Sequence, residues 1–308
     1  MITHYIARKG GEQGMAVIDS PIDGAWTHVV APTSDDFMYL ISHFGLEESI
    51  VNDIKDDYEI PRFEQDGTIT YFFTRFINGN EHIDTETSPL LIVLGASFIV
   101  TIANHEVPFL NSFVDGNRQF LTKNRTHFFL EIMMAIAADY SKALNVVRKS
   151  VYRDVNRVRN ISGRDIQRLV YFEQELNEIL STLLPTNAWL QQLTKGNYIQ
   201  MFEDDRELLD DVLISGTQIV DTTKAILKTI QNIRSASEAV LTQKLNGTIR
   251  MLTAFTIILT IPTLIASLFG MNVPVPLQEN PYGFWFVLIF IAGVVTVTIR
   301  FFVHNRWL

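Results

Sequence analysis

The last 58 residues of the chain constrain its fold more than any other part. They contain two apolar segments without charged side chains, residues 251–278 and 280–299, separated by the single acid Glu279. The apolar core of the first segment, Leu252–Phe269, is 18 residues long, close to the roughly 20 that a helix needs to cross a bilayer. Two such segments in tandem, with charged residues outside them, are typical of membrane spans rather than of buried core helices. The sequence therefore predicts two transmembrane helices.

The flanking charges predict an orientation. Lys244 and Arg250 precede the first span, and Arg300 and Arg306 follow the second, whereas the connecting loop 271–282 has no Lys or Arg. Positive flanks stay in the cytoplasm. We therefore expect a multi-pass protein of the plasma membrane with both termini in the cytoplasm. The N-terminus has no apolar stretch of the kind that a cleaved signal peptide contains.

The part before the spans is acidic. The last 58 residues hold two of the 25 basic and one of the 34 acidic side chains, so residues 1–250 carry 23 and 33 and a net charge of −10. This balance argues against a nucleic-acid surface and favours cations as partners, although ordinary solubility also explains it. The chain has no Cys and its seven His are scattered, so the usual zinc and copper ligand sets are missing. The lack of Cys also fits a reducing compartment.

The first 125 residues have mixed α/β character. Runs rich in β-branched and aromatic residues predict strands, and Gly95-Ala96 predicts the turn of a hairpin. Caps and glycines predict two short helices, of which the first opens at Ser34-Asp35-Asp36 and closes at Gly45. The expected strands are Ala25–Ala31, Thr68–Ile77, Leu90–Leu94 and Ser97–Ala103, and the second helix is Glu48–Asp56.

Long helices follow. Apolar residues at helical spacing over 126–158 and 164–194 predict an antiparallel pair, with Pro185 interrupting the second helix. A third helix is expected to start near Met201 and to run into the first membrane span. If it is a single helix to Phe269, it is about 100 Å long. So long a helix must pack on something, and copies of itself are the simplest partner.

A polar stripe runs along this third helix. Six Asn, Thr and Ser residues are separated by 7, 3, 4, 3 and 4 positions, which places them on one face. Such hydroxyls can bond back to their own helix or join helices together. Several copies around an axis would instead enclose a pore lined by oxygen atoms, which suits the strongly hydrated Mg²⁺. The stripe consists of Asn246, Thr253, Thr256, Thr260, Thr263 and Ser267.

The end of this helix carries a family resemblance. Residues 262–272, Pro-Thr-Leu-Ile-Ala-Ser-Leu-Phe-Gly-Met-Asn, resemble the signature that ends the first span of CorA-type magnesium transporters. The C-terminal Asn305-Arg306-Trp307-Leu308 is similar to the basic Trp-Leu ending of members. With two spans, a long preceding helix and an acidic α/β part, the resemblance covers the whole chain.

The resemblance implies an α+β fold assembled as a funnel-shaped homopentamer. Each subunit would have an αβα cytoplasmic domain, a hairpin of two "willow" helices, and a stalk helix that continues into the pore. The corresponding boundaries are 1–125 for the α/β domain, 126–200 for the willow helices, 201–250 for the stalk, 251–270 for the pore helix, 271–282 for the external loop, 283–302 for the second span and 303–308 for the tail.

The resemblance also implies roles for individual residues. Asn272 would form the selectivity ring that binds hydrated Mg²⁺, with Gly270 and Met271 shaping the turn. Thr263 and Asn246 fall where the family has pore-facing residues. Asp53 and Asp211 fall on acids that sense cytoplasmic Mg²⁺ between subunits. Asp211 also lies in a stretch, residues 203–211, with six acids in nine positions, where like charges repel unless a divalent ion or solvent screens them.

The chain departs from the family pattern at three points. Ser267 stands where Gly is common, and the external loop has its acid at Glu279 instead of in a Met-Pro-Glu-Leu sequence. An acidic ring lower in the stalk has no counterpart at Ser235, so no lower metal site is expected there.

The favoured function is passive, gated Mg²⁺ uptake, with Co²⁺ and Ni²⁺ as further candidate ions. A zinc transporter of the same superfamily is one alternative, against which Met271 counts, and a non-conducting membrane scaffold is another. A membrane-anchored enzyme is the third, but the chain has no phosphate-binding Gly-rich loop and no Gly-x-Ser-x-Gly sequence. Binding of nucleic acid is not expected.

Overall fold

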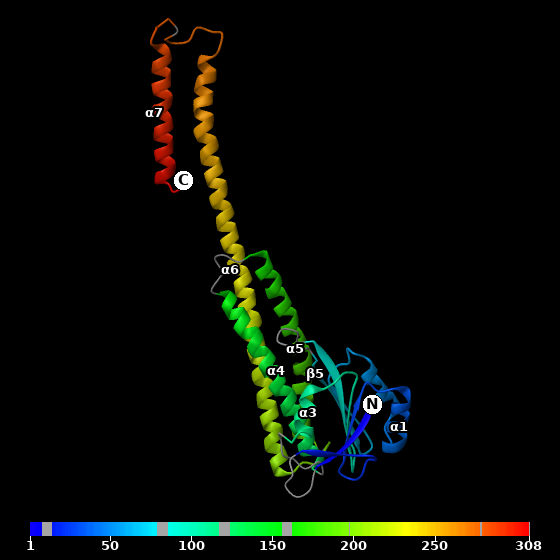
Figure 1. The fold of residues 1–308 in the computed structure, drawn as a ribbon. Helices are drawn as coiled ribbons and strands as arrows, with labels where there is room; N and C mark the ends of the chain where they lie inside the picture. Colours follow the sequence, from blue (N-terminus) through cyan, green and yellow to red (C-terminus); the bar gives the residue numbers. More distant parts are fainter. Residues whose placement is uncertain are drawn as a thin grey trace. The chain divides into compact units, whose positions relative to one another are not determined.

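The computed structural model describes residues 1–7, 14–78, 86–116, 124–155, 162–196, 198–277 and 279–307. The chain divides into two units, Met1–Asn232 and Ile233–Leu308 (Figure 1). One helix, α6 (Glu203–Phe269), contributes its first part to one unit and its last part to the other. Each unit is described by itself.

The first unit is built on a seven-stranded sheet with the strand order β2-β1-β3-β7-β6-β5-β4. Only the pair formed by β3 and β7 is parallel, and the other neighbours are antiparallel. The expected hairpin turning at Gly95 is present as β6 and β7. The strands are β1 (Ile2–Ala7), β2 (Met15–Ile18), β3 (Trp26–Val30), β4 (Arg62–Asp66), β5 (Ile69–Ile77), β6 (Thr87–Leu94) and β7 (Ile99–Ala103).

Short helices cover one face of the sheet. These are α1 (Ser34–Phe44), α2 (Glu48–Asn52) and the 3₁₀ turn η1 (Asp53–Lys55). Helix α1 has a capping box between Thr33 and Asp36 and ends at Gly45, whose φ of 66° is in the left-handed region that favours glycine. The core on this side joins these helices to β5, β6 and β7 through Leu40, Val51, Ile54, Phe73, Leu91 and Ile102, among others.

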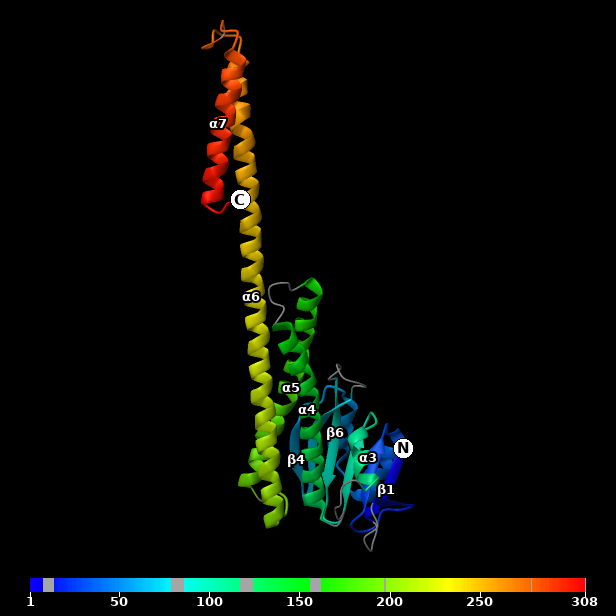
Figure 2. The same ribbon diagram turned by 60° about the vertical axis from the view of Figure 1, so that its left-hand side comes forward.

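Further helices cover the opposite face of the sheet, as Figure 2 shows. They are α3 (Pro108–Val114), α4 (Arg125–Val155) and α5 (Gly163–Lys195). The contact is largely aromatic: the Phe72 ring lies 4.4 Å from that of Phe129 and 5.3 Å from that of Trp189, between centroids. The sheet therefore lies between two helical layers, the αβα arrangement that the resemblance implies.

The prediction that Pro185 interrupts its helix is wrong. Helix α5 runs unbroken from Gly163 to Lys195 with Pro185 inside it. Proline removes one backbone N–H and crowds the carbonyl four residues earlier, which costs about 3 kcal/mol in an isolated helix. Here Leu183, Trp189 and Leu190 are buried on either side of the proline, so tertiary packing continues the helix through it.

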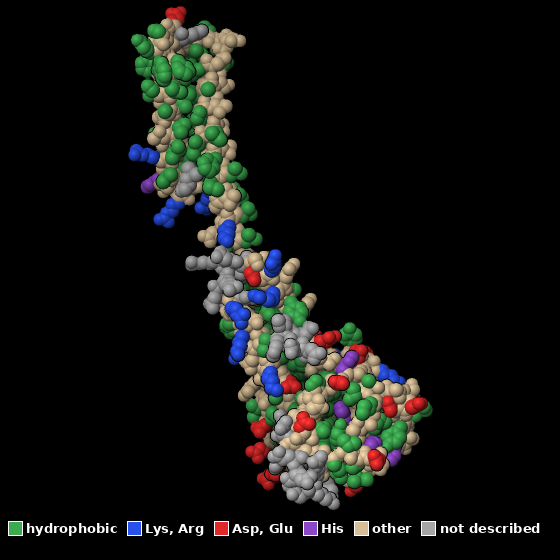
Figure 3. Space-filling model, viewed as in Figure 1, with side chains coloured by type: hydrophobic (Ala, Val, Ile, Leu, Met, Phe, Trp, Pro, Cys, Tyr) green, Lys and Arg blue, Asp and Glu red, His purple; other side chains and the backbone are tan. Residues whose placement is uncertain are grey.

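The second unit contains the end of α6 and helix α7 (Gly283–His304). Each has an 18-residue window long and apolar enough to cross a membrane, and only 6% of either window is buried within the structure. Both therefore differ from core helices of soluble proteins, which bury their apolar residues. Figure 3 shows hydrophobic side chains over α7 and the segment of α6 beside it.

Candidate pore and metal sites

The six stripe residues all lie on α6 and all are exposed in the single subunit. Helix α7 lies beside this part of α6 in both views (Figures 1 and 2), and the residues of α6 that are covered within the unit lie on the side away from the stripe. On that side Ala254 is fully buried, and Ile258, Ile261 and Ile265 are half-buried. At 3.6 residues per turn, the mean direction of the stripe lies about 140° from that of this buried face.

Helix α7 contributes a matching face. Its less exposed residues recur at helical spacing and end at Phe302, which is 5% exposed. They are Val287, Ile291, Val294, Val295, Thr298 and Phe302. Since the covered side of α6 is the one turned away from the stripe, the polar stripe stays exposed in the single subunit.

The threonine hydroxyls of the stripe donate hydrogen bonds to their own helix. The Oγ1–H groups of Thr253, Thr256, Thr260 and Thr263 each donate to the carbonyl four residues earlier, at 2.7–2.9 Å. Thr296 of α7 does the same at 2.7 Å, so this bond does not by itself identify a pore. Because this bond uses the hydroxyl hydrogen, the side chain can act towards its surroundings only as a hydrogen-bond acceptor, through the lone pairs of its oxygen.

The Gly-Met-Asn sequence follows directly on the end of α6. The Gly270 N–H donates to the carbonyls of Ala266 (3.0 Å) and Ser267 (3.2 Å) and so closes the last turn. Met271 is 54% exposed, and Asn272 is also exposed. A Cβ at position 270 would come no closer than 3.4 Å to any atom, so the backbone of one subunit does not itself require glycine there.

The loop after Asn272 closes tightly onto α7. Leu277 has a φ of 70°, and its carbonyl accepts from the N–H of Asn280 at 3.2 Å. A Cβ at Gly283 would lie 2.5 Å from that same carbonyl oxygen, so glycine is needed here for close approach.

The two predicted sensing acids lie in different layers of the first unit. Asp53 begins η1 on one face of the sheet, and its side chain is 46% exposed. Asp211 is exposed on α6, which contacts α4 on the other side of the sheet, for example through Ser215 and Met134. One subunit therefore does not bring the two carboxylates together. Among the described residues, no group of three or more His, Cys, Asp or Glu side chains could hold a metal ion. Carboxylate oxygens suit Mg²⁺, and a site using both acids would need a second copy.

Asp53 is bound to an arginine that the sequence analysis did not single out. Its Oδ2 accepts from Nη2 of Arg62 at 2.6 Å, while Nε of Arg62 donates to Glu64 at 2.6 Å and Nη1 donates to Glu59. The guanidinium carbon also lies 4.2 Å from the centroid of the Phe73 ring. Partial burial lowers the pKa of Arg62, but the hydrogen bond to Glu64 and the charges of the three acids outweigh burial and raise it. Only the fold brings these groups together, because β4 starts beside η1.

One acid of the 203–211 stretch has a structural role. Asp205 is fully buried, and its Oδ2 accepts from the backbone N–H of Phe202 at 2.9 Å at the start of α6. Its Oδ1 lies 3.2 Å from Nδ1 of His127 on α4. Asp205 thus caps α6 and ties it to α4, which leaves the exposed acids of the stretch for any cation.

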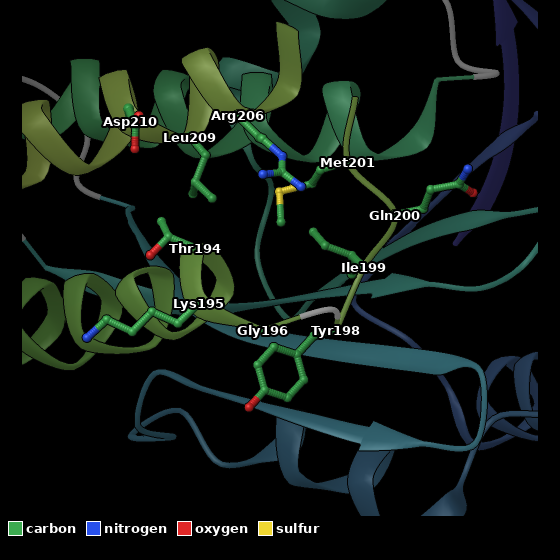
Figure 4. A pocket seen from close by; sticks show the side chains of 10 residues that line it. All are labelled: Thr194, Lys195, Gly196, Tyr198, Ile199, Gln200, Met201, Arg206, Leu209 and Asp210. Atoms are coloured by element: carbon green, nitrogen blue, oxygen red, sulfur yellow. The ribbon is translucent and has the colours of Figure 1, made fainter. Parts of the chain in front are cut away.

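A pocket of about 720 Å³ lies where α5 passes into α6. Figure 4 shows Ile199, Met201 and Leu209 facing it, while Lys195 extends away. Asp210 is the only acid in its lining, and none of the predicted site residues belongs to it. The ten residues that line it are Thr194, Lys195, Gly196, Tyr198, Ile199, Gln200, Met201, Arg206, Leu209 and Asp210.

Comparison with known proteins gives consistent results. The family model for CorA-like Mg²⁺ transporter proteins matches residues 23–304. The cobalt/magnesium transport protein CorA of Methanocaldococcus jannaschii is 22% identical over 293 residues, which cover 92% of this chain and 91% of that protein. The magnesium transport protein CorA of Salmonella typhimurium is 20% identical over 304 residues, covering 94% of this chain and 93% of that protein.

The solved structures agree on the fold. The complete CorA structure from M. jannaschii superposes with a TM-score of 0.89 at 18% identity, covering 100% of this chain and 99% of that one. The cytoplasmic domain of ZntB from Vibrio parahaemolyticus superposes with a TM-score of 0.64 at 11% identity, covering 78% of this chain and 98% of that domain. At these identities the superpositions establish a shared fold and no more. Because the family model spans both units and includes the stripe and the Gly-Met-Asn loop, this chain belongs to the CorA-like Mg²⁺ transporter family.

Proposed function

We propose that this chain is the subunit of a homopentameric, channel-like transporter that takes divalent cations, chiefly Mg²⁺, into the cytoplasm. The observation that carries the proposal is the exposed polar stripe on α6, which lies opposite the α7 contact and ends at Gly270-Met271-Asn272. Copies of α6 arranged around an axis would turn six rings of oxygen-bearing side chains inward. The α7 helices would lie outside them, towards lipid.

A pore of this kind suits a cation that keeps its water. Mg²⁺ loses water reluctantly, and its bound waters point their hydrogens outward, so they need acceptors. The Asn272 amide oxygens and the threonine oxygens, whose own hydrogens are committed to the helix, are such acceptors. None of these groups carries a charge that would trap the ion. With an inside-negative potential of 100 mV, moving a doubly charged ion inward is favoured by about 4.6 kcal/mol.

Cytoplasmic Mg²⁺ is proposed to close the pore. Asp53 of one subunit and Asp211 of its neighbour would hold the ion at the subunit contact, where two carboxylates repel each other until a cation bridges them. Mass action then stabilises the closed assembly when internal Mg²⁺ is high. Loss of the ion lets the subunits separate and the pore fill with water, which gives negative feedback on uptake.

The competing functions differ in what they transport or catalyse. A zinc transporter would share the fold, but Met271 completes the Gly-Met-Asn sequence of the magnesium branch. A scaffold has no use for a continuous polar stripe on an otherwise apolar membrane helix. An enzyme would need a reactive cluster, and the lining of the pocket between α5 and α6 offers only one acid.

Ion flux into proteoliposomes tests the proposal. Purified full-length protein should admit Mg²⁺ at a rate well above that of protein-free vesicles, and an inside-negative potential should increase that rate. Zn²⁺ uptake that exceeds Mg²⁺ uptake would favour the zinc branch. Absence of flux for Mg²⁺, Co²⁺, Ni²⁺ and Zn²⁺ alike, from correctly inserted protein, would leave the scaffold as the better function.

A further inference from the structure

The guanidinium of Arg62 already donates a hydrogen bond to one carboxylate oxygen of Asp53, the acid proposed to bind cytoplasmic Mg²⁺. We propose that Arg62 is an internal counter-ion that competes with cytoplasmic Mg²⁺ for Asp53 and thereby sets the Mg²⁺ concentration at which the sensing site fills. The inference rests on the proposed sensing role of Asp53 and adds to it a residue that controls its affinity.

The contacts of Arg62 engage all three of its donor nitrogens. Nη2 donates to Asp53 and Nε to Glu64, each at 2.6 Å, and Nη1 donates to Glu59. Arg62 is 32% exposed and Asp53 46%, so solvent and ions can reach both members of the pair. Three carboxylates around one guanidinium leave a formal charge of −2, which attracts a divalent ion even while Arg62 is bound.

The cluster is held in place by buried groups. Arg75, which is buried, donates through Nη1 to the backbone carbonyls of Asp57 (2.8 Å) and Glu59 (3.1 Å) and so fixes the loop that carries Glu59. The stacking of Arg62 on Phe73 restrains the guanidinium itself. Arg62 therefore pays little additional entropy to keep its contact with Asp53, unlike a mobile surface arginine.

The competition follows from the type of contact. Mg²⁺ held through its waters presents hydrogen-bond donors to a carboxylate, and the guanidinium presents donors to the same oxygen. Oδ2 of Asp53 cannot serve both fully, and the positive charge of Arg62 also opposes a nearby cation. Removing the guanidinium should therefore strengthen Mg²⁺ binding. A purely structural role for Arg62 predicts the opposite sign, because a disordered η1 would weaken the site.

The test measures the Mg²⁺ concentration that gives half-maximal protection of the full-length protein from chymotrypsin, which does not cut at Arg. For Arg62→Gln this concentration should fall about three- to tenfold relative to wild type, in line with the modest strength of partly exposed ion pairs. Arg62→Lys, which keeps the charge and loses the planar fork, should show a smaller fall. Arg168→Gln is the matched control, since it removes the same charge from the Asp165 pair at the start of α5 and should change nothing.

The outcomes separate this inference from the proposed function. If wild-type protein shows no Mg²⁺ protection, or Asp53→Ala leaves protection unchanged, sensing by Asp53 is wrong. If Asp53→Ala abolishes protection but Arg62→Gln leaves the midpoint unchanged or raises it, sensing stands and competition by Arg62 is overturned. Should Arg62→Gln unfold, as judged by Trp fluorescence without Mg²⁺, Arg62→Lys decides: an unchanged or raised midpoint overturns the inference.

Discussion

Asn272 and the threonines of α6 offer a hydrated cation different things at the scale of single side chains. Each of the four threonines already donates its hydroxyl hydrogen to a backbone carbonyl, so its exposed oxygen acts as an acceptor. An asparagine amide has an acceptor and two donors, and it can turn its oxygen towards the waters of an ion. A ring of Asn272 would therefore be the place where the ion's hydration shell is first recognised.

Asn272→Ala should lower Mg²⁺ flux at least about tenfold, because the acceptor is lost at the pore entrance. Flux into proteoliposomes measures the change, and size-exclusion chromatography checks that assembly is intact. Asn280→Ala in the same loop is a control, since its Oδ1 accepts from the N–H of Tyr282 at 2.9 Å and lies outside the Gly-Met-Asn sequence. Wild-type flux in correctly inserted Asn272→Ala would refute the entrance site.

His28 gives the cytoplasmic unit a dependence on pH. It is half-buried, and burial lowers its pKa to about 4, with an opposing contribution from its contact with Thr101. Nδ1 of His28 lies 2.8 Å from Oγ1 of Thr101, which also accepts from the indole N–H of Trp26 at 2.9 Å. The hydroxyl therefore has its hydrogen available for a neutral imidazole.

The free energy of unfolding should decrease as the pH is lowered, because His28 is protonated more readily in the unfolded chain than in the folded one. Between pH 6.5 and 4 the unfolded chain binds a proton at His28 that the folded chain does not, so unfolding becomes easier as pH decreases. From pH 7 to pH 5 the expected loss in the free energy of unfolding is about 2 kcal/mol. Denaturant unfolding followed by Trp fluorescence measures it, and His28→Gln should remove most of the slope. An unchanged slope in that variant would assign the pH dependence to other groups.

At the scale of elements, the sequence predicted strands and helices best where a segment is rich in residues that favour one kind of secondary structure. The β-branched and aromatic run before Ile77 and the hairpin around Gly95 appear as β5, β6 and β7, close to their expected bounds. Strand β4 was not predicted, because an edge strand with the sequence Arg-Phe-Glu-Gln-Asp leaves most of its side chains half-buried or exposed and has no apolar alternation. Strands β1 and β2 and helix α3 are short, and their burial depends on neighbours distant in sequence.

For the long helices too, one part of the structure could be predicted from the sequence and another part could not. The spacing of the stripe was readable in the sequence, but spacing alone cannot say which side of α6 meets another helix. That side follows from the burial of Ala254 and the isoleucines beside α7. The contact between Arg62 and Asp53 could not be predicted from the sequence for a similar reason, because it depends on the start of β4 lying next to η1 in the fold.

Cysteine scanning tests the assigned face of α6, and the absence of native Cys makes every introduced thiol unique. Cysteines at positions 260 and 263 should react with membrane-impermeant, water-soluble thiol reagents. Those at 261 and 265 should react slowly, because both positions are half-buried on the side of α6 away from the stripe. Reaction at 261 and 265 with protection at 260 and 263 would mean that the pore lies on the other side of the helix.

At the scale of the whole molecule, a single subunit leaves its membrane helices uncovered. Only 6% of each apolar window is buried, and the polar stripe would meet lipid if α6 stood alone. Exposed amides and hydroxyl oxygens in hydrocarbon are unfavourable, although four of the threonines already donate their hydroxyl hydrogens within the helix. In the proposed assembly, association around the stripe would hydrate it and leave apolar faces to the lipid.

Replacing both sensing acids should uncouple the assembly from internal Mg²⁺. The variant Asp53→Ala with Asp211→Ala removes the carboxylates that a bridging ion would join. Transport should persist, while inhibition by internal Mg²⁺ and Mg²⁺-dependent protection from protease both become weaker, by about tenfold or more in midpoint concentration. Full inhibition and protection in the double variant would move sensing to other exposed acids, such as Glu203, Asp204 or Glu207. Asp205 is excluded as a candidate by its role as a buried cap.

The parallel pairing of β3 with β7 also orders events during synthesis. Trp26 pairs with Ile99, 73 residues later in the chain, and this single ladder joins the β2-β1-β3 ribbon to the rest of the sheet. During synthesis, we therefore expect the free edge of β3 to stay unpaired until the hairpin of β6 and β7 has left the ribosome, because β7 is the only strand that pairs with that edge. The apolar spans emerge only after some 250 residues. The sheet and its helices can thus finish folding before the chain commits to the bilayer.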